Sequence, residues 1–261
     1  IEGPWSKPVR LNSTGFDPSL FHDADGRKWL VNMSWDFRKG HQKFGGILLQ
    51  EYGPKEQKLV GPIQNIYSGT ALGTTEGPPL YRHNGYSYLR TAEGGTGYEH
   101  AVSTARSKSL FGPYGNDPSG PVVTTNDNPD YPLQKAGHGS LVETQTGEWY
   151  LAHLVSRPFP DTKECILGRE TCLQKVNWTS DGWLRLADGG SLPQITVPAP
   201  TLAPHPFKAP PVRDEFDSET PSVHYQTLYT ALDETARALT ARPGFLRLYG
   251  GPSFAAPVPQ S

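Results

Sequence analysis

The sequence predicts an all-β protein, a partial β-propeller followed by the beginning of a β-sandwich. The composition favours short strands joined by turns, because 28 Gly, 26 Pro, 12 Tyr, 10 Phe and 6 Trp accompany a single Met in 261 residues. Two further observations support the prediction: a repeat of about 60 residues and a series of prolines after Gly190.

The repeat consists of three similar segments, residues 15–35, 75–95 and 137–157. Each has a polar residue, a short apolar strand, a glycine-containing turn and an aromatic-rich strand. Their matching leucines, Leu20, Leu80 and Leu141, are 60 and 61 residues apart. A unit of this length is enough for one four-stranded blade.

The turn inside each segment predicts a β-hairpin. The turn pairs are Asp25-Gly26, Asn84-Gly85 and Thr146-Gly147. Tight hairpin turns need positive φ at one or both central positions, which glycine and asparagine tolerate. Repeated β-meanders of this kind are typical of a β-propeller.

The prolines after Gly190 predict a domain boundary. They form a stiff, extended connector and comprise Pro193, Pro198, Pro200, Pro204, Pro206, Pro210 and Pro211. We therefore expect a propeller domain over residues 1–203, a linker over 204–212 and the start of a second domain over 213–261. Segments 223–232 and 243–251 read as strands of that domain, which is shorter than the ~100 residues of a typical sandwich.

Polar residues at the heads of the three repeats form a candidate site. Asp17, Glu76 and His138 lie three or four residues before the leucines. The innermost strands of a propeller start around one opening, so these side chains can converge. Two carboxyl groups in one pocket push their pKa values apart, so that one can act as a general acid. The alternative is that the carboxylates only bond the backbone at the strand entry.

Charge and hydropathy exclude several other functions. The formal net charge is −2, with 24 basic and 26 acidic residues, so nucleic acid and anionic membranes are not expected as partners. No apolar run approaches the roughly 20 residues of a membrane span. Cys165 and Cys172 lack the paired spacing of a zinc site and are expected to be free thiols.

Five motifs resemble family 43 glycoside hydrolases, more narrowly the β-xylosidases that carry a C-terminal β-sandwich. They are GFDPSLFHDADGRKWLVNMSW, TEGPPLY, LRTAEGGTGYEHAVSTARS, NPDYPLQKAGHGSLVETQTGEWYLAH and LGRETCLQK. The resemblance implies a five-bladed β-propeller followed by a concanavalin-A-like β-sandwich. It also implies that the complete protein can form a homo-oligomer.

The resemblance implies an inverting, exo-acting β-1,4-xylosidase that acts on xylo-oligosaccharides, with α-L-arabinofuranosidase activity as an accompanying possibility. Glu76 is then the general acid, and Asp17 raises the pKa of that acid and orients it. A third carboxylate serves as the general base, roughly 6.5–9.5 Å from the acid. This chemistry needs no metal cofactor.

Other roles implied by the resemblance fall on four matching residues, each with a structural alternative. Trp35 is expected to form an apolar wall against the sugar or to pack in the core. Thr96 lines the same subsite or has a turn role. His138 is the central-channel histidine, which in some members binds calcium or a water cluster, or it is a structural histidine. Arg169 bonds sugar hydroxyls and lowers carboxylate pKa values, or pairs with Glu170.

The sequence departs from the family pattern near its start. Glu2 is the sole acidic residue before Asp17, and its surroundings differ from the family's N-terminal Asp-Pro motif. We therefore expect the first blades and the general base to lie outside this chain, and the chain alone to be inactive. Arg90 also replaces an apolar strand residue.

The alternative functions are a base-less sugar-binding propeller module and a related arabinan-acting furanosidase.

Overall fold

The computed structural model describes residues 4–207, 209, 211–222, 224–225 and 236–250. The chain divides into two compact units, Ile1–Ala203 and Pro204–Ser261. All regular elements in the described ranges are strands, which confirms the all-β prediction. The part of the chain described here contains no helix able to cross a membrane.

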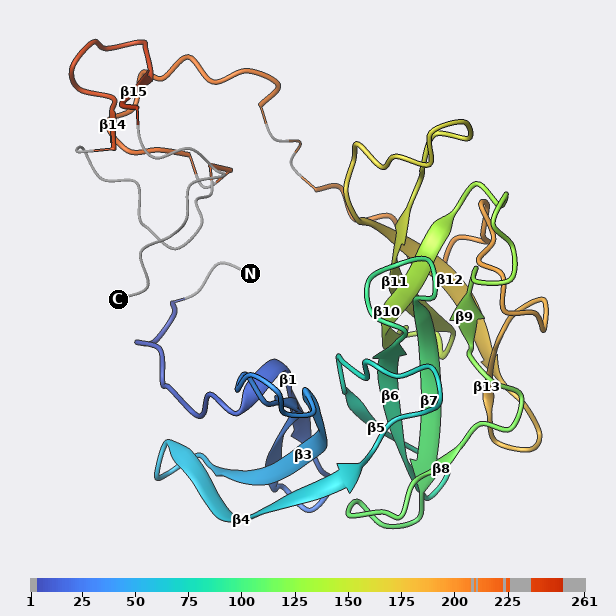
Figure 1. Cartoon of the computed structure of the whole chain (residues 1–261). Coiled ribbons are helices and arrows are strands. Elements are labelled where there is room, and N and C mark those ends of the chain that lie inside the picture. Colours follow the sequence, from blue (N-terminus) through green and yellow to red (C-terminus); the bar gives the residue numbers. More distant parts are fainter. Residues whose placement is uncertain (1–3, 208, 210, 223, 226–235, 251–261) are drawn as a thin grey trace. The chain divides into compact units, whose positions relative to one another are not determined.

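The first unit contains three antiparallel sheets whose main strands follow chain order (Figure 1). The first sheet contains β1 (Gly15–His22), β2 (Lys28–Trp35), β3 (Phe44–Gly53) and β4 (Lys58–Tyr67). The second contains β5 (Leu80–His83), β6 (Tyr86–Glu93), β7 (Ala101–Ser107) and β8 (Gly115–Asn116), with β9 (Val123–Thr124) paired to β7. The third contains β10 (Gln134–Glu143), β11 (Trp149–Ser156), β12 (Glu170–Trp178) and β13 (Leu184–Leu186). Each sequence repeat supplies the first two strands of a sheet.

The second sheet shows how the local sequence forms the predicted hairpins. His83 pairs with Tyr86, which leaves Asn84 and Gly85 as a two-residue turn. Their φ angles are 44° and 77°, the left-handed region required at both central positions of a type I′ turn. The turn therefore follows from two adjacent residues and needs no distant contact.

Hydrophobic side chains hold neighbouring sheets together. One core cluster joins the first and second sheets and includes the fully buried Val31, Ile47 and Leu89. Another joins the second and third sheets through side chains that include Val102 and Leu151. Each such side chain stabilises the fold by about 1.5–3 kcal/mol relative to an exposed position. β6 is buried along nearly its whole length, from Ser87 to Glu93, and contributes Leu89 to the first cluster.

Ion pairs also connect neighbouring sheets. Arg82 Nη2 of β5 lies 2.8 Å from Asp23 Oδ2 in the β1–β2 turn. Arg185 Nη2 of β13 donates to Asp117 Oδ1 over 2.9 Å. These contacts join segments 59 and 68 residues apart and help set the relative positions of the sheets.

The first part of the proline-rich segment is hydrogen-bonded to the third sheet, so it is not a free linker. Gln174 bonds both backbone groups of Gln194, donating from Nε2 to the carbonyl and accepting at Oε1 from the amide, each over 2.9 Å. Tyr150 donates its hydroxyl to the Pro198 carbonyl over 3.1 Å. Residues 193–201 therefore belong to the first unit.

The second unit has one described strand pair, β14 (Arg237–Ala238) with β15 (Arg247–Leu248). β15 lies in the predicted strand segment 243–251. Most of the other predicted segment, 223–232, lies outside the described residues, as does Glu2.

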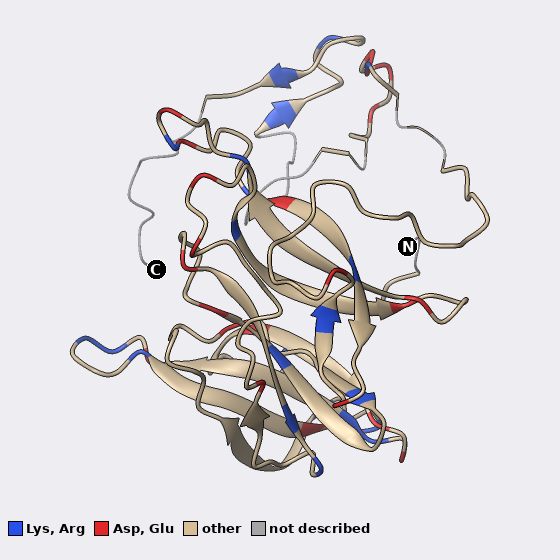
Figure 2. Cartoon of the chain, turned by 90° about the vertical axis from the view of Figure 1, so that its right-hand side faces the viewer, with Lys and Arg blue, Asp and Glu red and all other residues tan. Residues whose placement is uncertain are grey.

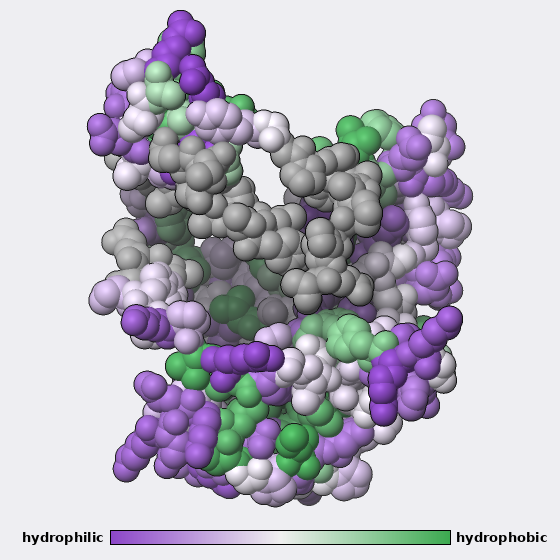
Figure 3. Space-filling model, turned by 60° about the vertical axis from the view of Figure 1, so that its left-hand side comes forward, coloured by the Kyte–Doolittle hydropathy of each residue, from purple (hydrophilic) through white to green (hydrophobic). Residues whose placement is uncertain are grey.

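Charged and hydrophobic residues are both dispersed over the described surface. Lys and Arg residues are interspersed with Asp and Glu, many of them in turns and at strand ends (Figure 2). Leu20 and Ile63 of the first sheet remain 46% and 53% exposed. Hydrophobic residues also appear among hydrophilic ones on the face shown in Figure 3.

Candidate active site

Each of the three repeats has a residue with positive φ close to the start of its inner strand. These residues are Asp17, Gly77 and His138, with φ angles of 50°, 52° and 47°. The pairing register of β1 shifts between Phe16 and Ser19, and that of β10 shifts between Gly137 and Ser140. Such bulges redirect side chains and often occur next to functional sites.

This geometry corrects the alignment of the repeat heads by one position. The equivalent of Asp17 and His138 in the second repeat is Gly77, three residues before Leu80. Glu76 lies one residue earlier, in an isolated bridge with Ala92. A sequence alignment based on polarity favours Glu76 because glycine has no polar side chain, whereas backbone conformation identifies Gly77.

The heads of the three repeats meet at Gly77. Its backbone amide donates a hydrogen bond to Asp17 Oδ2 over 3.1 Å. The His138 ring lies against the same glycine, since a Cβ built on Gly77 would be 2.7 Å from His138 Nε2. The structure therefore brings together three positions separated by about 60 residues in sequence.

Glu76 is held by its backbone and has a half-buried side chain. Its amide donates to the Ala92 carbonyl and its carbonyl accepts from the Ala92 amide, both over 2.8 Å. Burial raises the pKa of the Glu76 carboxyl, and the negative charge of Asp17 raises it further, whereas Arg169 lowers it. A carboxyl group that retains its proton to higher pH is suited to general acid catalysis.

A cavity of about 340 Å³ lies at this meeting point. Its lining residues come from the heads of all three repeats: Asp17, Pro18, Ser19, Gly77, Pro78, Pro79, His138 and Ser140. The cavity can hold a small polar molecule beside the Asp17 carboxylate and the His138 imidazole.

The positive charge of Arg169 acts on the residues around Gly77. Arg169 lies exposed immediately before β12, and its positive charge acts on both Glu76 and His100. The alternative of a pair with Glu170 is wrong, because Glu170 Oε1 lies 2.7 Å from Nη2 of Arg157. Arg169 thus remains available to a ligand.

Trp35 and Thr96 lie outside the contacts around Gly77. The half-buried Trp35 packs against the first core cluster, and its ring centroid lies 5.7 Å from that of Phe16, the neighbour of Asp17. Thr96 is exposed in the turn between β6 and β7. Their proposed contacts with sugar stay predictions.

Sequence reasoning missed two residues of this region, Gly77 and Glu93. Gly77 has no side chain, so its place in the site is visible only in its φ angle and in its contacts with Asp17 and His138. Glu93 ends a strand, where a charged residue is usually solvated, yet it is 0% exposed. Nothing in the residues around Glu93 predicts that its side chain is buried.

In the ranges that the structure describes, no group of three or more His, Cys, Asp and Glu side chains is arranged to hold a metal. The calcium suggested for His138 therefore stays a prediction. Cys165 and Cys172 are both half-buried free thiols.

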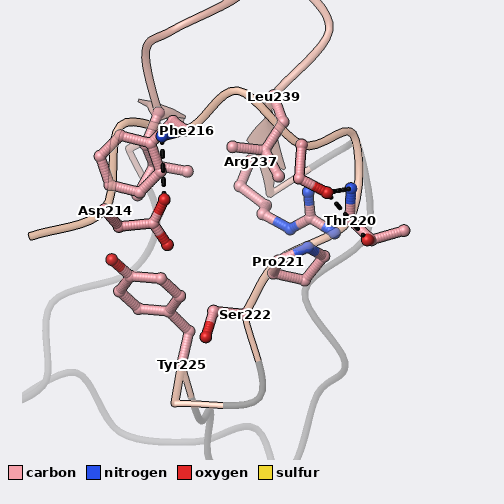
Figure 4. Close-up of a pocket in the computed structure, with 10 residues that line it drawn as sticks. Asp214, Phe216, Thr220, Pro221, Ser222, Tyr225, Arg237 and Leu239 are labelled. Atoms are coloured by element: carbon pink, nitrogen blue, oxygen red, sulfur yellow. Dashed lines mark hydrogen bonds between the residues drawn. The ribbon is translucent and has the colours of Figure 1, made fainter. Parts of the chain in front are cut away.

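The second unit contains a separate cavity of about 290 Å³ (Figure 4). Asp214 accepts a hydrogen bond from the Phe216 amide over 2.9 Å, and the Phe216 and Tyr225 ring centroids are 6.0 Å apart. Arg237 and Leu239 line the same cavity. It contains none of the predicted catalytic or substrate-binding residues.

Comparisons with known proteins agree with this architecture. Residues 1–184 match the model of glycosyl hydrolases family 43, and residues 213–261 match the beta xylosidase C-terminal concanavalin A-like domain. The chain is 46% identical over 270 residues to a beta-xylosidase of Bacillus subtilis (strain 168), covering 100% of this chain and 50% of that protein. It is 54% identical over 200 residues to xylosidase/arabinosidase 43B of Humicola insolens, covering 77% of this chain and 37% of that protein.

A solved structure extends the likeness to three dimensions. The crystal structure of xylan beta-1,4-xylosidase from Bacillus halodurans C-125 matches with a TM-score of 0.90 and 60% identity, over 97% of this chain and 48% of that one. The chain thus spans about half the length of the Bacillus subtilis beta-xylosidase and of the Bacillus halodurans xylosidase. The predicted fold class, part of a five-bladed β-propeller followed by the beginning of a concanavalin-A-like β-sandwich, is confirmed. The chain belongs to glycosyl hydrolase family 43.

Proposed function

We propose that the gene product carrying this sequence is an inverting, exo-acting β-1,4-xylosidase that hydrolyses xylo-oligosaccharides. The observation that carries the proposal is the half-buried Glu76 beside Asp17, with the pKa of Glu76 raised by burial and by the charge of Asp17. The names of the relatives, beta-xylosidase and xylosidase/arabinosidase, support xylose and arabinose as the sugars.

In this mechanism Glu76 donates its proton to the glycosidic oxygen as the bond to the anomeric carbon breaks. Burial and the negative charge of Asp17 favour the protonated form of Glu76, and Asp17 also accepts a hydrogen bond from the Gly77 amide. Arg169 and His138 face the sugar hydroxyls, and Trp35 and Thr96 complete the subsite. The reaction needs no metal cofactor.

Inversion requires a further carboxylate to activate water on the opposite face of the sugar. Within the described residues, Asp17 is the carboxylate whose charge acts on Glu76. We propose that the general base lies outside these 261 residues.

Glu76→Gln tests the acid role. A general acid contributes about 10²- to 10⁴-fold, so we expect a loss of that size on xylobiose. The loss on nitrophenyl-xyloside should be much smaller, because nitrophenolate leaves without a proton. Equal losses on both substrates would exclude Glu76 as the acid.

NMR of the first product should show α-xylose from a β-linked substrate, and release of β-xylose would contradict inversion.

A sugar-binding module is the second candidate, since a propeller with an acid and no base can retain a sugar without cleaving it. Calorimetric titration of the 261-residue chain with xylobiose distinguishes the two. Binding by both this chain and the whole gene product, with no hydrolysis by either, favours the module.

A further inference from the structure

Glu93 is a buried carboxylate at the end of β6 whose hydrogen bonds reach the segment that carries Glu76. It is 0% exposed. Its Oε2 accepts from the hydroxyls of Thr70 and Thr75 over 2.9 and 3.0 Å, and its Oε1 accepts from Thr91 over 2.9 Å. Among the described residues no Lys, Arg or His forms an ion pair with it.

The donors divide into two groups by location. Thr70 and Thr75 lie in the connection between β4 and β5, which leads directly into Glu76, whereas Thr91 belongs to β6 itself. Two of the three hydroxyls therefore tie this connection to β6. The third only helps to solvate the carboxylate.

Backbone contacts strengthen the same junction. The Gly94 amide donates to the Gly73 carbonyl over 2.8 Å, and Glu76 and Ala92 exchange the two bonds described above. The connection is also tightly folded, since a Cβ built on Gly69 would lie 2.2 Å from Thr75 Oγ1. Removal of the Thr75 hydroxyl would therefore disturb a connection that is closely packed around this residue.

A buried carboxylate without a cation is costly to the fold, because its desolvation exceeds what neutral donors return. Burial raises the pKa of Glu93, and its threonine partners oppose that change. An apolar residue would fill the same volume at lower cost but would leave the Thr70 and Thr75 hydroxyls without an acceptor. The specific effect of the carboxylate is thus to fix the connection before Glu76.

We propose that Glu93 is a positioning residue that holds the catalytic acid in place through Thr70 and Thr75. In this role Glu93 acts through the two threonines rather than through a contact with the substrate. The inference rests on the proposed function, because the acid role of Glu76 gives this tether its effect on catalysis.

Thr75→Val and Thr91→Val form a matched pair of variants in the whole gene product. Both remove one hydroxyl donor to the same carboxylate and keep the branched shape, but only Thr75 tethers the connection. With Thr75→Val we expect kcat on xylobiose to fall by about 10- to 100-fold, as for a displaced catalytic group, with little change in KM. The fall on nitrophenyl-xyloside should be much smaller. Thr91→Val should lower the activities on the two substrates in equal proportion, if at all.

NMR titration of the Glu76 carboxyl carbon supplies a second measurement that needs no activity. Its resonance is assigned from Glu76→Gln. We expect Thr75→Val to lower the pKa of Glu76 toward its ordinary value, because a loosened connection admits water, and Thr91→Val to leave that pKa unchanged.

The proposal is overturned if the two threonine variants change the pKa of Glu76 equally, or if neither changes it. A parallel fall on both substrates that follows thermal stability would also overturn it. Failure of the proposed function appears separately, as full activity of Glu76→Gln on xylobiose. Glu93→Gln keeps an acceptor oxygen for the Thr70 and Thr75 hydroxyls, so it should change both measurements less than Thr75→Val does.

Discussion

Asp17 accepts a hydrogen bond over 3.1 Å from the backbone amide of Gly77, the residue that directly follows Glu76. The bond joins the first two repeats at the position where both inner strands have a residue with positive φ. Asp17 can therefore orient the segment that carries Glu76 through this bond while its charge acts on the Glu76 carboxyl. Asn at position 17 would separate these effects, since it has an acceptor oxygen without the charge.

Asp17→Asn and Arg169→Gln should move the pH dependence of kcat/KM in opposite directions. In the proposed mechanism activity requires protonated Glu76, so it should be present below the pKa of Glu76 and be lost as pH rises through it. Asp17 raises that pKa and Arg169 lowers it. Asp17→Asn should therefore shift the alkaline limb to lower pH, and Arg169→Gln should shift it to higher pH. Profiles measured on xylobiose test this, and shifts in the same direction would contradict the assignment.

Gly77→Ala should cost more stability than Gly85→Ala, although both glycines have positive φ. The left-handed conformation alone costs a residue with a Cβ about 1–2 kcal/mol. At Gly85 the new methyl group meets no atom within 4 Å, whereas at Gly77 it meets the His138 ring. We expect a further loss of about 1–3 kcal/mol at Gly77 from overpacking.

Urea unfolding of the two glycine variants provides the measurement. The difference between their free energies of unfolding isolates the contact with His138, because the conformational cost is common to both. Equal losses would show that the imidazole moves aside without resistance.

Arg90→Met should stabilise the protein. Arg90 is 1% exposed, and its Nε and Nη1 atoms have no hydrogen-bond partner in the described part of the chain. Burial lowers the pKa of the guanidinium to about 10, and the guanidinium carbon lies 5.8 Å from the centroid of the Tyr81 ring. Even buried ion pairs can often be replaced by apolar residues of similar volume with no loss, or with a gain of about 1–4 kcal/mol.

Thermal unfolding of Arg90→Met and Arg90→Lys checks this explanation. Lysine retains a buried charge and should bring no gain. If methionine lowers stability by more than about 1 kcal/mol, Arg90 makes a net favourable interaction that its surroundings do not reveal.

The local sequence was sufficient to predict the hairpin that begins each of the three sheets in the first unit. The hairpin at Asn84-Gly85 depends on the conformational freedom of two adjacent residues, and the repeat of Leu20, Leu80 and Leu141 locates equivalent strands. The family motifs then predicted Asp17 and Glu76 as site residues. All of these signals lie within short stretches of chain.

Only the tertiary structure decided how these parts meet. It placed Gly77 rather than Glu76 at the position equivalent to Asp17, paired Glu170 with Arg157, and buried Glu93 among threonines. Each outcome depends on how separate segments pack, because hydrogen bonds and charges act over a few ångströms in space regardless of sequence distance. The sequence by itself determined the hairpins, the repeat and the family; packing between the repeats determined the surroundings of Glu76.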